Sequence, residues 1–518
     1  MLFTVLNFLE ESSIIRGEKI AATEGENRLT FKELREEAIA TAQALVDLGI
    51  KPGDRVGVCM NKSLEQILAI LGTLYANAIF IPILPSLKET SIDHILTNSG
   101  MSVIITDTKR IKEVEAFGHR VKIIIGSGVL SYEHINLSYL RKKFKRSNSP
   151  AFERIGIDTA AIIYSSGSTG RPKGIMVSHR NLADGAHIVA KYLGTNEKDR
   201  IASILSFNFD YGLNQIWQSL LTGASIHLHE LVLPNDCISF LAREKITALP
   251  LMPVIISRLF DKRLYDCNHV QDLSSIRYVC SSGGRISSEM IEKVKGAFSQ
   301  AQIYLMYGLT EAFRSTFLPP DQLSIRPNSI GKPIPSVEIM VLDDKGNECM
   351  PGTPGELVHR GGCITKGYWN DEVKTNERYR KHPKYPGEIL VYSGDLVTKD
   401  ADGFITFIGR IDGMLKSYGI RVSPTEVEEV IESYEKVDSC VVFGVENIEV
   451  GYDLIAVYTT KNLEPISDSE LFQYLKVKLA SHMIPRFLVH QQQFPSTGNQ
   501  GKIDRLVVRE NALNYLGY

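Results

Sequence analysis

The sequence predicts an α/β protein, with a large N-terminal part made of layered sheets plus a β-rich subdomain, followed by a small α+β domain. Two features predict this architecture. Helical and strand patterns alternate through the first half of the chain, which is typical of helices packed on mostly parallel sheets. After about residue 330, glycine and proline become dense and hairpin signals such as Asp402-Gly403 appear.

The individual elements of the first half follow from their patterns. Residues 31–48 place apolar side chains at helical spacing, and Thr30 is suited to cap this helix. A second helix is predicted at 64–74. Short, largely apolar runs predict strands at 55–59, 78–84, 103–106 and 159–164. The apolar but short N-terminus, interrupted by two glutamates, favours an amphipathic helix over a signal peptide.

Bulk composition excludes several classes of protein. The chain has 518 residues, a net charge of −2 and no long basic run, so nucleic acid is not expected as the main partner. Its seven cysteines are scattered, which argues against a disulfide framework or a structural zinc site and fits a reducing cytoplasm. No apolar run approaches the roughly 18–20 residues that span a bilayer.

A domain boundary is predicted at residues 410–413, where glycines interrupt the strand pattern. We therefore expect an N-terminal core at 1–411 and a C-terminal domain at 412–518. In the C-terminal domain, helices are predicted near 425–435 and 468–480, and strands near 439–444 and 454–459.

Residues 164–174, YSSGSTGRPKG, form the first motif with chemical meaning. They follow a predicted buried strand, and free backbone amides of a glycine loop, together with one lysine, suit phosphate groups. A plain surface linker is the alternative. The motif is not a Walker A loop, because Lys173 lies between Pro172 and Gly174.

Four further motifs follow in order: YGLTE at 307–311, YSGD at 392–395, a long run at 409–428, and PSTGNQGKIDR at 495–505. Each alone could be an ordinary turn or surface segment. In this order and spacing, the five motifs resemble the adenylate-forming superfamily, which includes acyl-CoA synthetases, adenylation domains that serve carrier proteins, and luciferases. The pocket residues described below are most similar to stand-alone amino-acid-activating members. The resemblance covers essentially the whole chain.

The resemblance implies an AMP-forming acid–thiol ligase that works in two steps. A carboxylate attacks the α-phosphorus of ATP and gives an acyl-adenylate and pyrophosphate; a thiol then takes the acyl group and releases AMP. Because two anions must meet, catalysis is mainly positioning and charge neutralisation. The resemblance gives Lys502 the bridge between the carboxylate and the α-phosphate, and gives Glu311 the Mg²⁺ ion.

The remaining nucleotide and catalytic residues are also implied by the resemblance. The loop is expected to hold the β- and γ-phosphates, and Asp395 with Arg410 is expected to contact the ribose. Thr310 joins the catalytic set, and adenine is expected near residues 283–285 and Tyr307. The residues expected to bind the nucleotide are Ser165, Ser166, Gly167, Ser168, Thr169, Gly170, Lys173, Gly283, Gly284, Arg285, Tyr307, Gly308, Asp395 and Arg410.

Asp412 occupies the hinge position of the family. The resemblance implies that the small domain is mobile and rotates there between the two steps. Rotation would withdraw Lys502 and bring the loop at Gly419 toward the active site.

The acid-binding pocket is expected around residues 206–212, SFNFDYG. In the amino-acid-activating relatives a Phe-Asp pair stands at this point, and the aspartate binds an ammonium; here the pair is Phe209-Asp210. An unpaired buried carboxylate is costly, which favours an ammonium-bearing substrate over a fatty acid. The other pocket positions are Tyr211, Asn214, Pro250, Cys280, Ser282, Met306, Arg314 and Ser315.

Arg314 departs from the apolar residue usual in the family. It either binds a second carboxylate of the substrate or simply pairs with Asp210 or Glu311, and the sequence leaves both open. The thiol acceptor is also open: the Phe-Asp pair favours phosphopantetheine on a separate carrier protein, and free CoA is the alternative. A member that only binds nucleotide is disfavoured because Lys502, Glu311 and Asp395 are all present.

Overall fold

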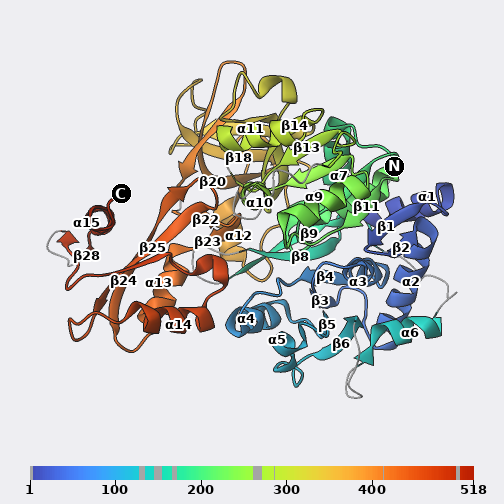
Figure 1. The fold of residues 1–518 in the computed structure, drawn as a ribbon, viewed down its shortest axis with the longest axis horizontal. Helices are drawn as coiled ribbons and strands as arrows, with labels where there is room; N and C mark the ends of the chain where they lie inside the picture. The colour runs from blue at the N-terminus through green and yellow to red at the C-terminus, as the bar shows by residue number, and fades with distance from the viewer. Residues whose placement is uncertain are drawn as a thin grey trace.

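The computed structural model describes residues 4–127, 135–144, 154–165, 172–260, 271–284, 286–411, 413–497 and 502–518. At residues 127, 496, 497 and 502, only the backbone is described. The predicted α/β architecture is confirmed: helices cover sheets in the N-terminal part, and a smaller domain projects from it near the C-terminus (Figure 1).

The first sheet carries the N-terminal helical layers. Within the described residues it has seven strands, with β3 parallel to β4 and β5, and β8 antiparallel to β9. Across the sheet the order is β7 (Ile135–Asn136), β6 (Lys122–Ser127), β5 (Val103–Asp107), β3 (Arg55–Cys59), β4 (Ile79–Pro82), β8 (Thr159–Ser165) and β9 (Lys173–Ser178).

The second sheet joins a parallel half to an antiparallel half, and has 14 strands in the described part of the chain. Strands β10 to β14 run parallel, while β14 to β21 pair antiparallel. The order is β17 (Val337–Leu342), β18 (Gly355–Gly361), β20 (Ile389–Lys399), β21 (Ile405–Arg410), β16 (Ser329–Pro333), β15 (Ala312–Leu318), β14 (Gln302–Leu309), β13 (Tyr278–Ser281), β12 (Ala248–Leu251), β10 (Arg200–Ser203), β11 (Ser225–Leu228), β1 (Ile20–Glu24) and β2 (Asn27–Thr30), with β19 (Tyr379–Lys381) on β20.

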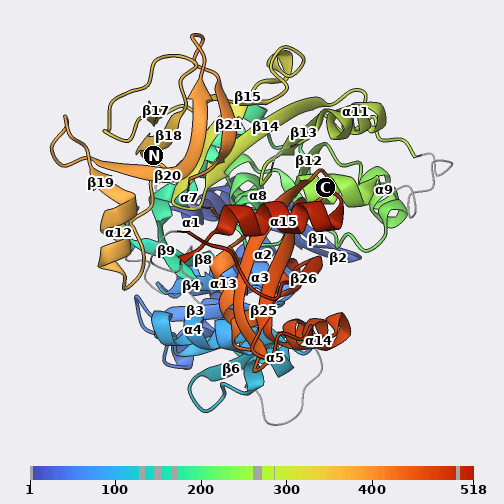
Figure 2. The same cartoon turned by 90° about the vertical axis from the view of Figure 1, so that its left-hand side faces the viewer.

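The strands described after residue 413 pair only among themselves and have their own apolar clusters. They form one five-stranded sheet and one short hairpin, which lie beside the main body (Figure 2). The strands are β22 (Leu415–Ser417), β23 (Ile420–Val422), β24 (Val437–Asn447), β25 (Gly451–Thr460), β26 (Phe487–His490), β27 (Ser496–Thr497) and β28 (Lys502–Ile503).

Helices cover both large sheets and both faces of the small one (Figure 1). The α-helices are α1 (Val5–Ile15), α2 (Phe31–Asp47), α3 (Leu64–Tyr75), α4 (Glu89–Ser99), α5 (Ile111–Glu115), α6 (Leu137–Phe144), α7 (His179–Leu193), α8 (Asp210–Thr222), α9 (Pro234–Arg243), α10 (Pro253–Leu259), α11 (Ser288–Ala297), α12 (Glu372–Arg378), α13 (Pro424–Glu432), α14 (Asp468–Lys478) and α15 (Arg505–Leu516). Short 3₁₀ turns occupy Pro320–Gln322 and Ser481–Met483.

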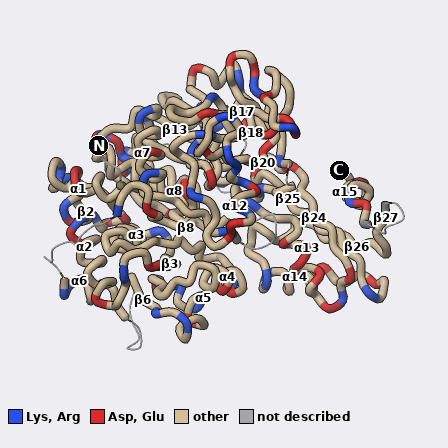
Figure 3. Tube along the Cα trace, turned by 180° about the vertical axis from the view of Figure 1, so that it is seen from behind, with Lys and Arg blue, Asp and Glu red and all other residues tan. Residues whose placement is uncertain are grey.

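The predicted elements lie within a few residues of those in the structure. Thr30 caps α2 as expected, and Glu33 completes a capping box by accepting hydrogen bonds from Thr30. Lys, Arg, Asp and Glu are interspersed along the trace (Figure 3). None of the described helices is both long and apolar enough to cross a membrane.

Helix α8 is fixed in place by close packing at its first turn. Its Trp217 is fully buried, and its Gly212 lies so close to the preceding loop that an added Cβ would stand 1.9 Å from the Ser206 carbonyl oxygen. Only glycine allows this approach, which sets the position of Asp210 at the start of the helix.

We expect Gly212→Ala to destabilise the protein by about 1–3 kcal/mol, because the new methyl group must push the backbone at Ser206 away. Gly296→Ala is the matched control, since that glycine also lies in a helix and its added Cβ would meet nothing within 4 Å. Urea unfolding of both variants measures the difference. Equal stability of the two variants would contradict this account of α8.

Candidate active site

Polar and small residues gather where neighbouring parallel strands end. Residues 206–211 follow β10, Met252 follows β12, residues 282–283 follow β13, and Thr310 follows β14. The carboxyl ends of parallel strands meet at one edge of a sheet, where open α/β sheets bind ligands. Pro82 and Ser165, at the ends of β4 and β8, bring the other sheet to the same place.

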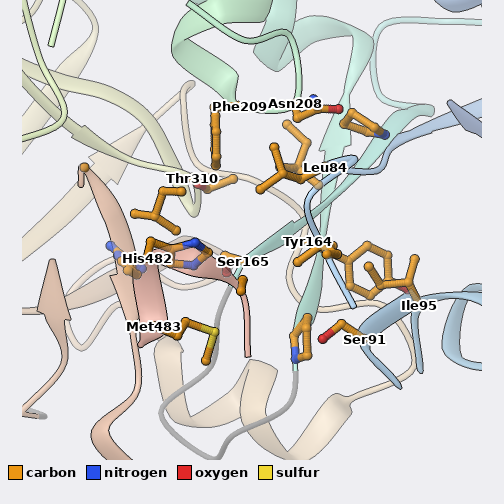
Figure 4. Close-up of a pocket in the computed structure, with 18 of the residues that line it drawn as sticks. Leu84, Ser91, Ile95, Tyr164, Ser165, Asn208, Phe209, Thr310, His482 and Met483 are labelled. Carbon is orange, nitrogen blue, oxygen red and sulfur yellow. The ribbon is translucent and has the colours of Figure 1, made fainter. Parts of the chain in front are cut away.

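These segments line a cavity of about 620 Å³ together with residues of the C-terminal domain. Figure 4 shows Phe209, Asn208 and Thr310 at one end, with His482 and Met483 of the C-terminal domain facing Tyr164 and Ser91 across the space. The cavity therefore lies between the two parts of the chain. The expected site residues that line it are Ser165, Phe209, Asp210, Tyr211, Ser282, Gly283, Gly308, Thr310 and Arg314.

Asp395 is the centre of a buried polar cluster. It lies opposite Arg410 in the β20–β21 pair, and its carboxylate accepts hydrogen bonds from the Arg410 guanidinium and the Tyr307 hydroxyl. Arg410 also donates to the Ser393 carbonyl at 3.1 Å. Burial and the Asp395 charge raise the pKa of Tyr307 well above its ordinary value, so this hydroxyl remains a donor.

Glu311 is a second buried carboxylate, only 2% exposed. Tyr368 donates to its Oε1 at 3.0 Å, and Arg421 of β23 stands 3.5 Å from its Oε2. Burial raises the pKa of Glu311, but Arg421 and Arg378 outweigh that effect and lower it below the ordinary value. Glu311 is therefore ionised at neutral pH.

The β22–β23 hairpin brings two cations into this site. Besides Arg421, it carries Lys416, and burial together with the nearby Arg421 lowers the Lys416 pKa to about 8, against the attraction of Asp395 and Asp210. Gly419, at the turn of the hairpin, lies against the Met252 side chain. Gly419 thus lines the cavity together with Lys416 and Arg421.

Sequence comparison identifies the protein class. A family model for AMP-binding enzyme matches residues 9–369, and one for the AMP-binding enzyme C-terminal domain matches residues 426–501. The chain belongs to the AMP-binding enzyme family. It is thus an adenylate-forming enzyme of the ligase class, as the five motifs indicate.

Curated relatives match nearly all of this AMP-binding enzyme. Tyrocidine synthase 1 of Brevibacillus parabrevis is 29% identical over 98% of the chain, and surfactin synthase subunit 1 of Bacillus subtilis (strain 168) is 31% identical over 97%. The chain spans 45% of the first relative and 14% of the second, so these relatives are much longer proteins.

Solved structures share the fold along the whole chain. The o-succinylbenzoate CoA synthetase of Bacillus subtilis superposes with a TM-score of 0.84 at 24% identity, covering 97% of this chain and 98% of that one. The amide bond synthetase McbA of Marinactinospora thermotolerans gives 0.86 at 20% identity, covering 98% and 99%. The anthranilate CoA ligase AuaEII, solved with anthranoyl-AMP, gives 0.74 at 26% identity, covering 99% and 98%.

Several expected nucleotide residues lie outside the described part of this AMP-binding enzyme. These are residues 166–170 of the loop, Arg285 and the hinge residue Asp412. Lys173 is described at the start of β9, where its ammonium lies 5.4 Å from the Tyr368 ring centroid. Burial lowers the pKa of Lys173. Tyr368 thus contacts both Lys173 and Glu311.

Lys502 is far from the cavity in this arrangement of the domains. It belongs to β28, which lies with α15 at the outer side of the C-terminal domain in both views (Figures 1 and 2). The hairpin β22–β23 faces the main body instead. The strand that carries Lys502 and the hairpin that carries Gly419 thus lie on different sides of the C-terminal domain. The family resemblance assigns the first to adenylation and the second to thiol transfer.

The expected acid pocket divides into an inner lining and a second layer. Asp210 pairs with Arg314, whose guanidinium carbon also stands 5.2 Å from the Tyr211 ring centroid. The Tyr211 hydroxyl donates to the Cys280 carbonyl at 3.0 Å. The positions buried behind the described lining are Asn214, Pro250, Cys280, Met306 and Ser315.

Glu311 fits the magnesium role that the motifs imply. Mg²⁺ is usually held by one or two carboxylates together with substrate phosphate oxygens. Glu311 supplies one buried, ionised carboxylate, and its Oε2 has no hydrogen-bond partner among the described residues. The described residues hold no cluster of three metal-binding side chains, so phosphate would have to complete such a site.

Sequence reasoning assigned no role to Arg421, Lys416 or Tyr368. Arg421 and Lys416 both lie in the 409–428 motif, on either side of Gly419. The sequence predicts that the Gly419 loop approaches the active site, so this prediction could have pointed to the two cations. Tyr368 lies in no motif. Its contact with Glu311 depends on the β9 region bridging to residue 368, which only the structure shows.

Glu426 of α13 gives this interdomain cavity a pH dependence. Burial and the neighbouring Glu429 raise the pKa of Glu426 to about 8 from the ordinary 4.5, so the folded protein favours its neutral form. The stabilisation from proton binding is complete below pH 4.5 and is lost as the pH rises through about 8. Glu426→Gln should therefore be more stable than wild type at pH 9 and comparable at pH 4.5.

Thermal unfolding at several pH values tests this prediction. Glu435→Gln is the control, because Glu435 is exposed and lies just beyond the same helix. The Glu426→Gln variant should show a flatter decline of unfolding temperature between pH 5 and 9 than wild type or the control. Parallel curves for all three proteins would show that Glu426 titrates normally.

Proposed function

We propose that this enzyme uses ATP to activate an amino acid as an acyl-adenylate and transfers the acyl group to a phosphopantetheine thiol on a separate carrier protein. The observation that carries the proposal is the arrangement of three buried or partly buried carboxylates: Asp210 and Glu311 follow strands of the parallel half of the sheet, and Asp395 of β20 accepts a hydrogen bond from Tyr307 of β14. Each suits a different cationic or hydroxyl-bearing part of the reactants.

At the nucleotide end, Asp395 is proposed to accept hydrogen bonds from the ribose hydroxyls, with Arg410 holding its carboxylate in place. The segment from Ser165 to Lys173 supplies amides and one ammonium to the pyrophosphate. Gly283 and Tyr307 border the adenine. A bound Mg²⁺ would neutralise phosphate charge, and Glu311 would hold it.

At the acid end, Asp210 is proposed to bind the ammonium of the substrate. The carboxylate to be activated then points toward Thr310 and the α-phosphate. Lys502 is proposed to approach both anions when the C-terminal domain rotates about Asp412, because a point charge there offsets the charge that develops in the transition state. Withdrawal of Lys502 and docking of Arg421 belong to the second step.

The cavity supports a thiol as the acceptor. From Thr310 it continues past Ser165 to Ser91 and His482, so a long, narrow arm could reach the activated carbonyl (Figure 4). The charged lining outside the acid pocket carries both signs among the described residues: Lys88, Lys416, Arg421 and Lys478 lie with Asp93, Glu426 and Glu429. The three carboxylates lie among the cations and would repel the phosphates of CoA, which favours a carrier-bound arm.

The first test is acid-dependent pyrophosphate release with ATP and Mg²⁺. The panel holds proteinogenic, D- and β-amino acids, dicarboxylates, and aryl and fatty acids. Selective release with amino acids supports the proposal, and Asp210→Asn should abolish most of it. Release with only aryl or fatty acids would replace the amino-acid assignment with an acyl-CoA synthetase.

The two half-reactions should respond to different residues. We expect Lys502→Ala to lower adenylate formation by roughly 100-fold or more, because it removes a charge aimed at the transition state. Arg421→Gln should leave pyrophosphate release within a few-fold of wild type and slow acyl transfer, because it weakens the docked hairpin. Single-turnover assays of each step check this. Equal losses in both steps for both variants would contradict a division by domain arrangement.

The hinge gives a further test of the same scheme. Asp412→Pro should retain pyrophosphate release and impair acyl transfer, because proline fixes φ where rotation requires it to change. Transfer is measured to free CoA, to pantetheine and to a phosphopantetheinylated carrier protein. Transfer to CoA with full efficiency would favour the acyl-CoA synthetase alternative for the second step.

A further inference from the structure

Arg314 is a buried cation in the wall of the acid pocket. It lies in β15, is 4% exposed and lines the cavity beside Asp210 and Tyr211. Its φ of 66° is a left-handed conformation that arginine rarely adopts. An added Cβ on Gly308 would stand 3.1 Å from the Arg314 Cα, so a glycine opposite makes room for this backbone. A strained residue held this way commonly serves a site.

The charged groups of Arg314 and Asp210 are farther apart than in a close ion pair. The two contacts, Nη1 to Asp210 Oδ2 and Nη2 to the Asp210 carbonyl, measure 3.4 and 3.3 Å. A close charge-assisted bond measures about 2.7–2.9 Å, and Arg277 of this protein reaches Asp199 at 2.8 Å. Arg314 Nε has no hydrogen-bond partner among the described residues. The guanidinium thus keeps donors available to a ligand.

Charge balance decides what the pocket can take. Within the N-terminal part, Asp210 and Arg314 cancel each other, and both are poorly hydrated. A lone ammonium on Asp210 would leave one positive charge in excess beside Arg314, and a lone carboxylate would leave one negative charge in excess. An ammonium and a carboxylate together preserve neutrality and satisfy both side chains. Lys416 also faces Asp210, but it belongs to the β22–β23 hairpin, which the proposed rotation would carry away during adenylation.

We propose that the pocket selects aminodicarboxylic acids, whose ammonium binds Asp210 and whose second, unreacting carboxylate binds Arg314. This inference rests on the proposed adenylation. It makes Arg314 a specificity-determining residue and explains why the pair is loose: the substrate inserts between its two members. Tyr211, stacked near the guanidinium, holds Arg314 toward the cavity.

Matched substrates test the inference in the wild-type enzyme, with no variant required. Pyrophosphate release is compared for aspartate against asparagine, and for glutamate against glutamine, using both enantiomers, together with aminoadipate, succinate, glutarate, alanine, leucine and phenylalanine. The members of each pair differ only in the second carboxylate. The best acidic amino acid should exceed its amide in kcat/KM by about 100-fold or more.

Arg314→Gln should then reduce that acid-to-amide ratio at least about tenfold, through the KM for the acidic substrate and through gained activity on the amide. Arg277→Gln is the matched control, because it also removes one arginine from an Arg–Asp pair on the same sheet but lies outside the described cavity lining. It should leave the ratio unchanged.

The outcomes separate this inference from the function on which it rests. If a neutral amino acid or an acid without an ammonium is the best substrate, and Arg314→Gln keeps the wild-type ranking, the inference is wrong while adenylation stands. If folded wild-type enzyme releases no pyrophosphate with any acid of the full panel, the proposed function itself is wrong. Retained selectivity for acidic amino acids in Arg314→Gln would also overturn the role of Arg314.

Discussion

Charge compensation in a poorly hydrated space is the constraint on which the rest of this structure depends. Asp210 lines the cavity, Glu311 follows Thr310 of its lining, and Asp395 contacts Tyr307, the neighbour of the lining residue Gly308. The described residues give each of the three carboxylates an arginine: Arg314, Arg421 and Arg410. Unpaired buried charges are expensive, so these pairs fix how the strands that carry them can be arranged. Any ligand that enters must either join a pair or replace one of its members.

The three pairs differ in where the arginine comes from. Arg410 lies directly across a strand pair from its partner, so the Asp395 pair is a fixed part of the sheet. Arg314 stands in the wall of the acid pocket and is only loosely engaged. Arg421 comes from the C-terminal domain. Glu311 is therefore both the contact of that domain and the proposed metal ligand, and a metal bound there would link nucleotide chemistry to domain position.

Local sequence signals predicted the fold well, because the helices and strands of both sheets have clear apolar periodicity. They also singled out Asp210, Glu311 and Asp395 as candidates, whose roles stay predictions; the structure places Asp210 and Glu311 after strands of the parallel half and Asp395 within β20. The sequence left two interpretations of Arg314 open: a contact with a second substrate carboxylate, or an ion pair with Asp210 or Glu311. Periodicity could not choose between them, because the side-chain rotamer and the distance between the charged groups decide which contact forms. Arg421 lay inside a recognised motif, but its partner could not be named from sequence; Tyr368 lay in no motif. The contacts of both residues with Glu311 join segments far apart in the chain.

A crystal structure with Mg²⁺ and a non-hydrolysable ATP analogue tests the central claim most directly. The account predicts ribose hydroxyls on Asp395, phosphates beside Lys173, the metal on Glu311, and Arg421 no longer in contact with Glu311. Nucleotide bound away from Glu311 and Asp395, or bound at Glu311 with Arg421 still in place, would contradict the claim that the ligand joins the Asp395 pair and replaces Arg421 at Glu311.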